Sequence, residues 1–159
     1  MKNKTKLKLL LSMMLLATPS IAQDSFKEEQ KRAARAKNFA DFLLYWSDWD
    51  AYLDVSIIDK KLAERETYEE AKTRIPELVQ DSTYYADEIV KSASIINKRY
   101  PLNKQPDMAY FLYEIKDIYK DKKSDRNSDE YKLGRTLAEY ERVLKELKLA
   151  RYTLRINQK

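Results

Sequence analysis

The chain has 159 residues, with 31 basic residues, 26 acidic residues, no histidine and no cysteine. Without histidine and cysteine it cannot build Ser-His-Asp or Cys-His nucleophile systems, the usual zinc sites or a disulfide. One glycine, four prolines and 36% charged residues are typical of helices rather than of sheets or loop-rich folds.

The first 22 residues have the three-part order of a secretory signal peptide. Four lysines within the first eight residues precede an apolar run from Leu9 to Ala17, and Ser20 and Ala22 are small residues flanking a predicted cut before Gln23. The run is about half the ~20 residues that a membrane-spanning helix needs. We therefore favour cleavage over a permanent membrane anchor, and expect a periplasmic or secreted protein with no transmembrane span in the mature form.

Removal of this leader changes the net charge. It takes away four lysines and no acidic residue, so the charge falls from +5 for the whole chain to about +1 for residues 23–159. A strongly basic domain would have indicated nucleic acid or an anionic membrane as the partner. The mature charge gives no such indication, and we expect no nucleic-acid binding.

The first predicted helix runs from about Phe26 to about Ala63, with Ser25 and Glu28 as a capping box at its start. Apolar residues recur on one face at steps of three and four: Phe39, Phe42, Trp46, Trp49, Leu53 and Ile57. A second apolar stripe falls on roughly the opposite face: Ala40, Leu44, Ala51, Val55, Ile58 and Leu62. A helix with two apolar faces is either central in its bundle or shares one face with another molecule.

A second helix is predicted over residues 68–96, starting at a capping box of Thr67 and Glu70. Apolar residues keep the helical period along it, and Pro76 predicts either a kink or a restart within it. Pro101 and Pro106 bracket a loop, because the residue before a proline is pushed out of the helical region.

Two further helices follow this loop. Asp107 is predicted to cap a short helix with these apolar residues: Met108, Phe111, Ile115 and Ile118. Asn127 or Ser128 is predicted to cap the last helix, which has a heptad-like seam: Leu133, Leu137, Tyr140, Leu144, Leu147, Arg151 and Leu154. Gly134 and Ala138 lie beside the seam, where a neighbouring helix can approach closely. The sequence therefore predicts an all-α fold, an antiparallel bundle of three to four amphipathic helices in one domain over residues 23–159, after a cleaved signal peptide.

Acidic residues offer two kinds of candidate chemistry. Asp50 and Asp54 are four apart on the first helix, as in a sugar-cleaving carboxylate pair, but charges at the edge of an amphipathic helix explain them more simply. Residues 125–129 match the opening of an EF-hand loop, yet Glu130 and Thr136 stand where glycine and glutamate belong. Residues 48–50 fail in the same way. We therefore expect no catalytic residue, no metal site and no cofactor.

Two surfaces are candidates for partner binding. The first helix has a cluster of large aromatic residues: Tyr45, Trp46, Trp49 and Tyr52. We favour the interpretation that these side chains lie in the core or at its edge over the alternative that they form an exposed binding patch. The predicted partner-binding residues on this helix are Leu44, Tyr45, Tyr52, Val55, Ile58 and Leu62, for a homodimer or for another protein. A basic column on the last helix is either a contact face or a solvated one: Lys145, Lys148, Arg155 and Lys159.

These observations favour an exported, non-enzymatic protein that acts by binding another protein of the cell envelope, such as an accessory or assembly component of a bacterial envelope machine. Two alternatives stay open. One is a periplasmic immunity or inhibitor protein that neutralises a toxin or lytic enzyme, and the other is a holdase chaperone with exposed apolar surface. A small carboxylate-based hydrolase is the least favoured class.

Overall fold

The structure, a computed structural model, describes residues 3–57, 66–101, 103–104 and 107–157, with side chains for residues 25–52 and for the described residues from 66 onward. Within these ranges the chain forms four helices and no strand. They are α1 (Asn3–Ile57), α3 (Tyr68–Asn97), α4 (Met108–Lys120) and α5 (Asp129–Ile156). The expected all-α fold is confirmed.

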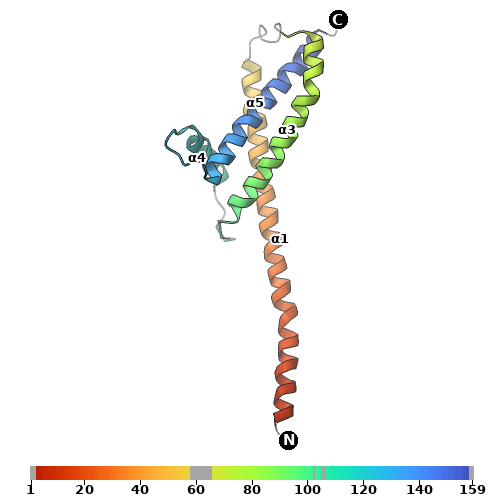
Figure 1. The fold of residues 1–159 in the computed structure, drawn as a ribbon, viewed down its shortest axis with the longest axis vertical. Coiled ribbons are helices and arrows are strands. Elements are labelled where there is room, and N and C mark those ends of the chain that lie inside the picture. The colour runs from red at the N-terminus through yellow and green to blue at the C-terminus, as the bar shows by residue number, and fades with distance from the viewer. Residues whose placement is uncertain (1–2, 58–65, 102, 105–106, 158–159) are drawn as a thin grey trace.

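The three long helices pack side by side as a bundle (Figure 1). α3 runs antiparallel to α1, and α5 runs antiparallel to α3. The short α4 lies at the side of the bundle beside the start of α5, against which it packs, and it also contacts α1. The N-terminal part of α1 extends beyond the other helices (Figure 1). Among the described residues, no helix combines the length and the apolar character that crossing a membrane requires.

Three predicted helix starts are present. Thr67 Oγ1 accepts a hydrogen bond from the Glu70 backbone N–H, and the Glu70 carboxylate accepts one from the Thr67 N–H at 2.8 Å, which is the predicted capping box. Asp107 caps α4 and Ser128 caps α5 with the same kind of side-chain acceptor. These caps satisfy N–H groups that have no partner inside their own helix, so they fix where each helix begins.

One predicted helix boundary is wrong. α1 is already helical before Ser25 and passes through it, so Ser25 caps no helix start in this chain. The preceding segment is rich in leucine, alanine, methionine and lysine, all of which favour helix. Of the two alternatives predicted at Pro76, the restart is not observed: α3 continues through the proline, with buried residues on both sides of it. The predicted end of the first helix near Ala63 lies outside the described residues.

The core consists of two clusters of buried side chains. The larger joins all four helices: Phe39, Ala40, Leu43, Ile89, Ala93, Ile96, Phe111, Leu112, Ile115, Leu133 and Leu137. The smaller joins α3 and α5: Ala71, Leu78, Val143, Leu147 and Ala150. The predicted seam of α5 is largely confirmed, because its leucines at 133, 137, 144 and 147 are buried, whereas Arg151 is exposed. Both α3 and α5 contribute to the two clusters, so their packing connects the whole core.

α4 and α5 approach each other closely at Gly134. A Cβ atom built on this glycine would lie 2.7 Å from the Cβ of Tyr119 and 2.8 Å from the carbonyl oxygen of Ile115. Both neighbouring atoms belong to α4 and have little freedom to move. The predicted close approach beside the seam is confirmed at Gly134, and it sets the position of α4 on the bundle.

The buried face of α1 differs from the predicted one. Its buried residues are Phe39, Ala40, Leu43, Ser47 and Ala51. This face lies between the two predicted apolar stripes and takes residues from each, with Ser47 in its middle at 0% exposure. Three of the five side chains are small, which lets neighbouring helices approach α1 closely. Phe39 is the one large aromatic side chain among these five, whereas four other large aromatic side chains of α1 lie at the protein surface: Tyr45, Trp46, Trp49 and Tyr52.

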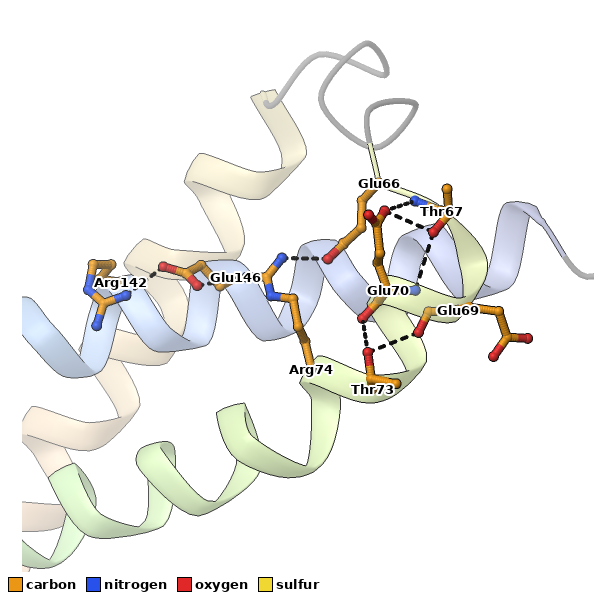
Figure 2. A network of polar contacts seen from close by, with 8 residues as sticks. All are labelled: Glu66, Thr67, Glu69, Glu70, Thr73, Arg74, Arg142 and Glu146. Atoms are coloured by element: carbon orange, nitrogen blue, oxygen red, sulfur yellow. Dashed lines mark hydrogen bonds and ion pairs between the residues drawn. The ribbon is translucent and has the colours of Figure 1, made fainter.

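Charged side chains join the start of α3 to α5 (Figure 2). The guanidinium of Arg74 contacts the carboxylate of Glu66 at 2.5 Å and that of Glu146 at 2.8 Å. Glu146 also pairs with Arg142 at 2.6 Å on the same helix. Because Glu66, Arg74 and Glu146 are partly buried, solvent screens their charges less than it screens free surface pairs. The network and the capping box together fix the N-terminal end of α3.

The other end of α3 is held by Arg35 of α1. Its guanidinium donates to the backbone carbonyls of Asn97 at 2.9 Å, Tyr100 at 2.8 Å and Pro101 at 2.7 Å. Carbonyls at a helix C-terminus have no partner within the helix and carry partial negative charge, so a cation there is favourable. Arg35 thereby ties the middle of α1 to the turn that leads toward α4.

Candidate protein-binding surface

Large aromatic side chains gather at the surface of α1 and α4. We name them the aromatic surface: Tyr45 (64% exposed), Trp46 (39%), Trp49 (43%), Tyr52 (56%), Tyr110 (68%) and Tyr113 (71%). On α1 the rings of Tyr45 and Trp46 meet edge to face, and those of Trp49 and Tyr52 stack, each pair with centroids 5.9 Å apart. The favoured interpretation of the α1 cluster as core or core edge is therefore wrong, because all four side chains are substantially exposed.

The placement of these rings follows from which residues the core takes. On α4, Phe111 and Ile115 are buried against the bundle, so Tyr110 and Tyr113 fall toward solvent. On α1 the small-residue face around Ser47 is buried, and Tyr45 and Tyr52 lie on the far side of the helix. The aromatic surface is thus the outward side of two helices that the core holds in place.

A groove lies between the α1 part and the α4 part of the aromatic surface, and side chains of both parts line it. This α1–α4 groove has a volume of about 260 Å³ and is lined by Phe42, Trp46, Asp50, Ala109, Leu112, Tyr113 and Lys116. Trp46 belongs to one wall and Tyr113 to the other. Apolar clefts with a few polar groups are the usual shape of sites that accept a ligand or a partner's side chain.

A polar junction lies at one end of this groove, where α1, α4 and α5 meet. The ammonium group of Lys116 donates to Asp50 Oδ2 at 2.7 Å and pairs with Glu141 Oε1 at 2.8 Å. Buried Ser47 also donates to Glu141, at 3.3 Å. Burial by itself would lower the pKa of Lys116, but the two carboxylates outweigh it and raise the pKa above its usual value. Lys116 is therefore a positioned cation between two carboxylates.

The predicted partner-binding residues of α1 are distributed over different environments. Leu44 is partly buried and packs against the larger core cluster, whereas Tyr45 and Tyr52 are exposed on the aromatic surface. Val55 lies within α1, but its side chain is outside the described part of the structure. Ile58 and Leu62 lie outside the described residues. The structure therefore brings two of the six together, Tyr45 and Tyr52.

The predicted basic face of α5 is only partly available to a partner. Lys148 pairs with the Asp48 carboxylate at 2.9 Å, donates to the Asp48 carbonyl at 2.8 Å and lies 5.7 Å from the centre of the Tyr52 ring. Lys145 is partly buried, Arg155 is exposed in the last turn of α5, and Lys159 lies outside the described residues. Because Lys148 has its carboxylate and its aromatic ring within this chain, it belongs to the bundle's own packing.

The acidic candidates form helix-packing and turn contacts. Asp50 pairs with Lys116, while the side chain of Asp54 is outside the described part of the chain. In the segment that resembles the start of an EF-hand, Asp125 Oδ1 accepts from the backbone N–H of Asn127 at 2.9 Å, which is a local turn bond. Among the described residues, no three acidic side chains converge as a cation site.

Sequence reasoning missed both the polar junction and the α4 part of the aromatic surface. Asp50 and Lys116 are far apart along the chain, and no local pattern links them. The sequence did contain a sign of Tyr110 and Tyr113. They lie outside the helix face that Phe111 and Ile115 define, at positions where an exposed helix face usually has charged residues.

Comparison with protein-family models, with curated proteins and with solved structures gave no significant match. The candidate surface therefore rests on the residues of this chain alone.

Proposed function

We propose that this chain is an exported, non-enzymatic protein that acts by binding another protein of the cell envelope, with the aromatic surface as its contact. The observation that carries the proposal is the exposure of six large aromatic side chains on adjoining faces of α1 and α4. Tyrosine and tryptophan are enriched in protein interfaces, because they bury a large area with few rotatable bonds and keep a polar group. Single exposed apolar residues are ordinary, whereas contiguous ones mark a binding site.

The internal pairing of charged groups supports a binding role over a catalytic one. Asp50, the carboxylate that lines the α1–α4 groove, is engaged by Lys116, which also pairs with Glu141. Elsewhere on α1, Asp48 is engaged by Lys148. A general acid or base must be free to exchange its proton with a substrate. These groups are instead used to hold α4 and α5 against α1, beneath an aromatic exterior.

An export signal supports the cell envelope as the place of action. The order of lysines, apolar run and small residues in the first 22 residues is that of a cleavable leader. On this proposal the mature protein begins at Gln23 and works in the periplasm or outside the cell. A component or accessory of an envelope machine is the kind of protein that the proposal describes.

The proposal is tested with the exported protein and two matched double variants. The test variant, Trp49→Ser with Tyr113→Ser, removes rings from both parts of the aromatic surface. The control variant, Tyr84→Ser with Ile95→Ser, removes comparable exposed apolar area from α3. Each protein is immobilised and exposed to envelope extract, and bound proteins are identified by mass spectrometry. We expect the first variant to lose a partner that wild type and the α3 variant retain, with all three proteins folded by circular dichroism. Equal binding by all three, or no specific partner at all, would contradict the proposal.

The C-terminal part of the second apolar stripe of α1 has its own test as a candidate contact between chains, because Ala40 and Ala51 of this stripe are buried within the bundle. Val55→Lys with Ile58→Lys places two charges on this stripe. If the stripe is an interface, the variant stays folded and loses a homodimer or the captured partner. If the stripe is core, the variant loses several kcal/mol of stability, since two charges would be buried without partners. Sedimentation and a thermal melt distinguish these outcomes, and unfolding of a protein that is monomeric to begin with would exclude the interface.

A further inference from the structure

We infer that the aromatic surface recognises a basic segment of the partner, with an arginine or lysine side chain inserted into the α1–α4 groove. This inference rests on the proposed function and adds the chemistry of the partner. It follows from three features of the described residues: the aromatic walls of the groove, the excess of carboxylates around Tyr113, and an internal lysine that is already bound in the same manner.

The walls of the groove suit a cation with an aliphatic stem. Phe42 and Trp46 line one side and Tyr113 the other, with the half-exposed carboxylate of Asp50 between the helices. Aromatic faces attract cations through the negative face of the ring, with tryptophan the strongest, and guanidinium groups also stack on them. The methylene stem of an arginine or lysine is apolar and fits against the same rings.

The charge of the surrounding surface points to a basic segment rather than a single cation. A second groove of about 330 Å³ adjoins the first on α4, since Tyr113 lines both, and Tyr110, Glu114, Asp117 and Asp121 line it with Tyr113. Among the described residues that line this second groove, none is basic. Four carboxylates and one ammonium group thus line the two grooves together, and such an excess attracts a segment of opposite charge.

Lys116 does not cancel this attraction. Its ammonium group is shared between Asp50 and Glu141, so the junction of three charges keeps a net negative charge. Lys116 is bonded to Oδ2 of Asp50, and the Asp50 side chain remains 42% exposed. Asp50 therefore keeps accessible carboxylate surface beside Trp46.

The chain already contains one example of this recognition. Lys148 of α5 lies against the face of Tyr52, 5.7 Å from the ring centre, while its ammonium group pairs with Asp48. Tyr52 and Asp48 belong to the same helix as Trp46 and Asp50. The outward side of α1 thus binds a lysine between a ring and a carboxylate at one place, and the α1–α4 groove offers the same pair of groups to a cation from outside.

A peptide probe tests the inference without knowledge of the partner. The exported protein is titrated with tetra-arginine amide, and binding is followed by ¹⁵N chemical shifts and by tryptophan fluorescence, since Trp46 and Trp49 are the two tryptophans. We expect saturable shifts centred on the groove residues, weakened by added salt, and none with tetra-glutamate. Shifts spread over acidic residues of the whole surface, or a response to tetra-glutamate at the groove, would overturn the inference.

Variants with matched loss of charge sharpen the test. Glu114→Gln with Asp117→Asn neutralises two exposed carboxylates beside the groove, and Glu77→Gln with Asp87→Asn neutralises two exposed carboxylates on α3. We expect the α4 pair to weaken tetra-arginine binding about three- to ten-fold and the α3 pair to change it less than about two-fold, because screening confines charge effects to nearby sites. An equal effect of the two pairs would refute the inference.

The captured partner separates failure of this inference from failure of the proposed function. Consider first that the aromatic double variant, Trp49→Ser with Tyr113→Ser, loses capture of the partner, while the charge double variant, Glu114→Gln with Asp117→Asn, keeps its affinity. The aromatic surface then binds a partner whose contact segment is not basic. The proposed function then stands and the inference falls. Loss of capture in both variants, together with a salt-dependent affinity of the wild-type protein for the partner, supports the inference. Unchanged capture by both variants refutes the inference and the proposed function together.

Discussion

The close approach of α4 and α5 gives a sharp prediction about stability, because the two physical effects of one substitution have opposite signs. Gly134→Ala adds a single methyl group. In a helix without neighbours this change stabilises by about 0.5–1 kcal/mol, since glycine loses more backbone entropy than alanine. In this chain the added Cβ would lie 2.7 Å from Tyr119 Cβ and 2.8 Å from the Ile115 carbonyl oxygen.

The magnitude follows from these distances. An ordinary contact begins at 3.4 Å, so α4 and α5 must separate by about 0.7 Å to accept the methyl group. Overpacking of this kind costs about 1–3 kcal/mol. After the gain in helix propensity is subtracted, we expect a net loss of about 0.5–2 kcal/mol. For a chain of this size that is a fall in Tm of about 2–8 °C.

Thermal and urea unfolding followed by circular dichroism measure this loss. Lys132→Gly, at an exposed position of α5, is the control for helix propensity, and we expect it to cost about 1 kcal/mol. Gly134→Ala also moves α4, which carries Tyr113 and Lys116, so the emission of Trp46 in the groove should change as well. A Gly134→Ala protein as stable as wild type, or more stable, would show that α4 does not pack on α5 at this distance.

Three further predictions concern charge and processing. Lys116→Met leaves the partly buried Glu141 without its cation and should cost about 1–3 kcal/mol in urea unfolding, and adding Glu141→Leu should restore part of the loss. The capping box lowers the pKa of Glu70, mainly through its hydrogen bond to the backbone of Thr67. Its contribution to stability is therefore present above the usual glutamate pKa and lost as pH falls through the lowered one, so Glu70→Gln and wild type should converge in stability between about pH 7 and about pH 3. A persistent difference at the acid end would contradict this. Intact mass of the exported protein should correspond to a chain starting at Gln23, and a retained leader would contradict cleavage and move the protein to a membrane-anchored class.

Helix starts and the faces of α3 and α5 were predictable, because local chemistry determines them. A cap such as Thr67 with Glu70 needs only the backbone N–H groups of its own first turn, and those are present wherever the helix forms. The leucines of α5 recur at a helical period and are large enough to dominate any packing arrangement. Their burial at Leu133 and Leu137 therefore required no knowledge of the neighbouring helices.

The buried face of α1 could not be predicted from apolar periodicity. Its inward positions include Ala40, Ser47 and Ala51, whose side chains carry little apolar area, while larger apolar rings such as Trp49 lie outside. Which face is buried depends on how near the neighbouring helices approach, and that distance is set by the whole bundle. The pairing of Asp50 with Lys116 depends on the same packing, since it joins helices that are distant in sequence.

The arrangement of α1 itself bears on function. A helix that needed only to stabilise this bundle would place its largest apolar side chains inward, where each buried ring contributes a few kcal/mol. Instead Tyr45 and Trp49 lie outward, where their exposed area contributes little to folding. Replacing an exposed side chain away from any cap or core contact usually changes stability by no more than about 0.5 kcal/mol. Folding therefore does not account for these rings, and an exposed aromatic face lowers solubility. On the proposed function the rings are buried against a partner, where they exclude water and gain contacts that the bundle does not provide.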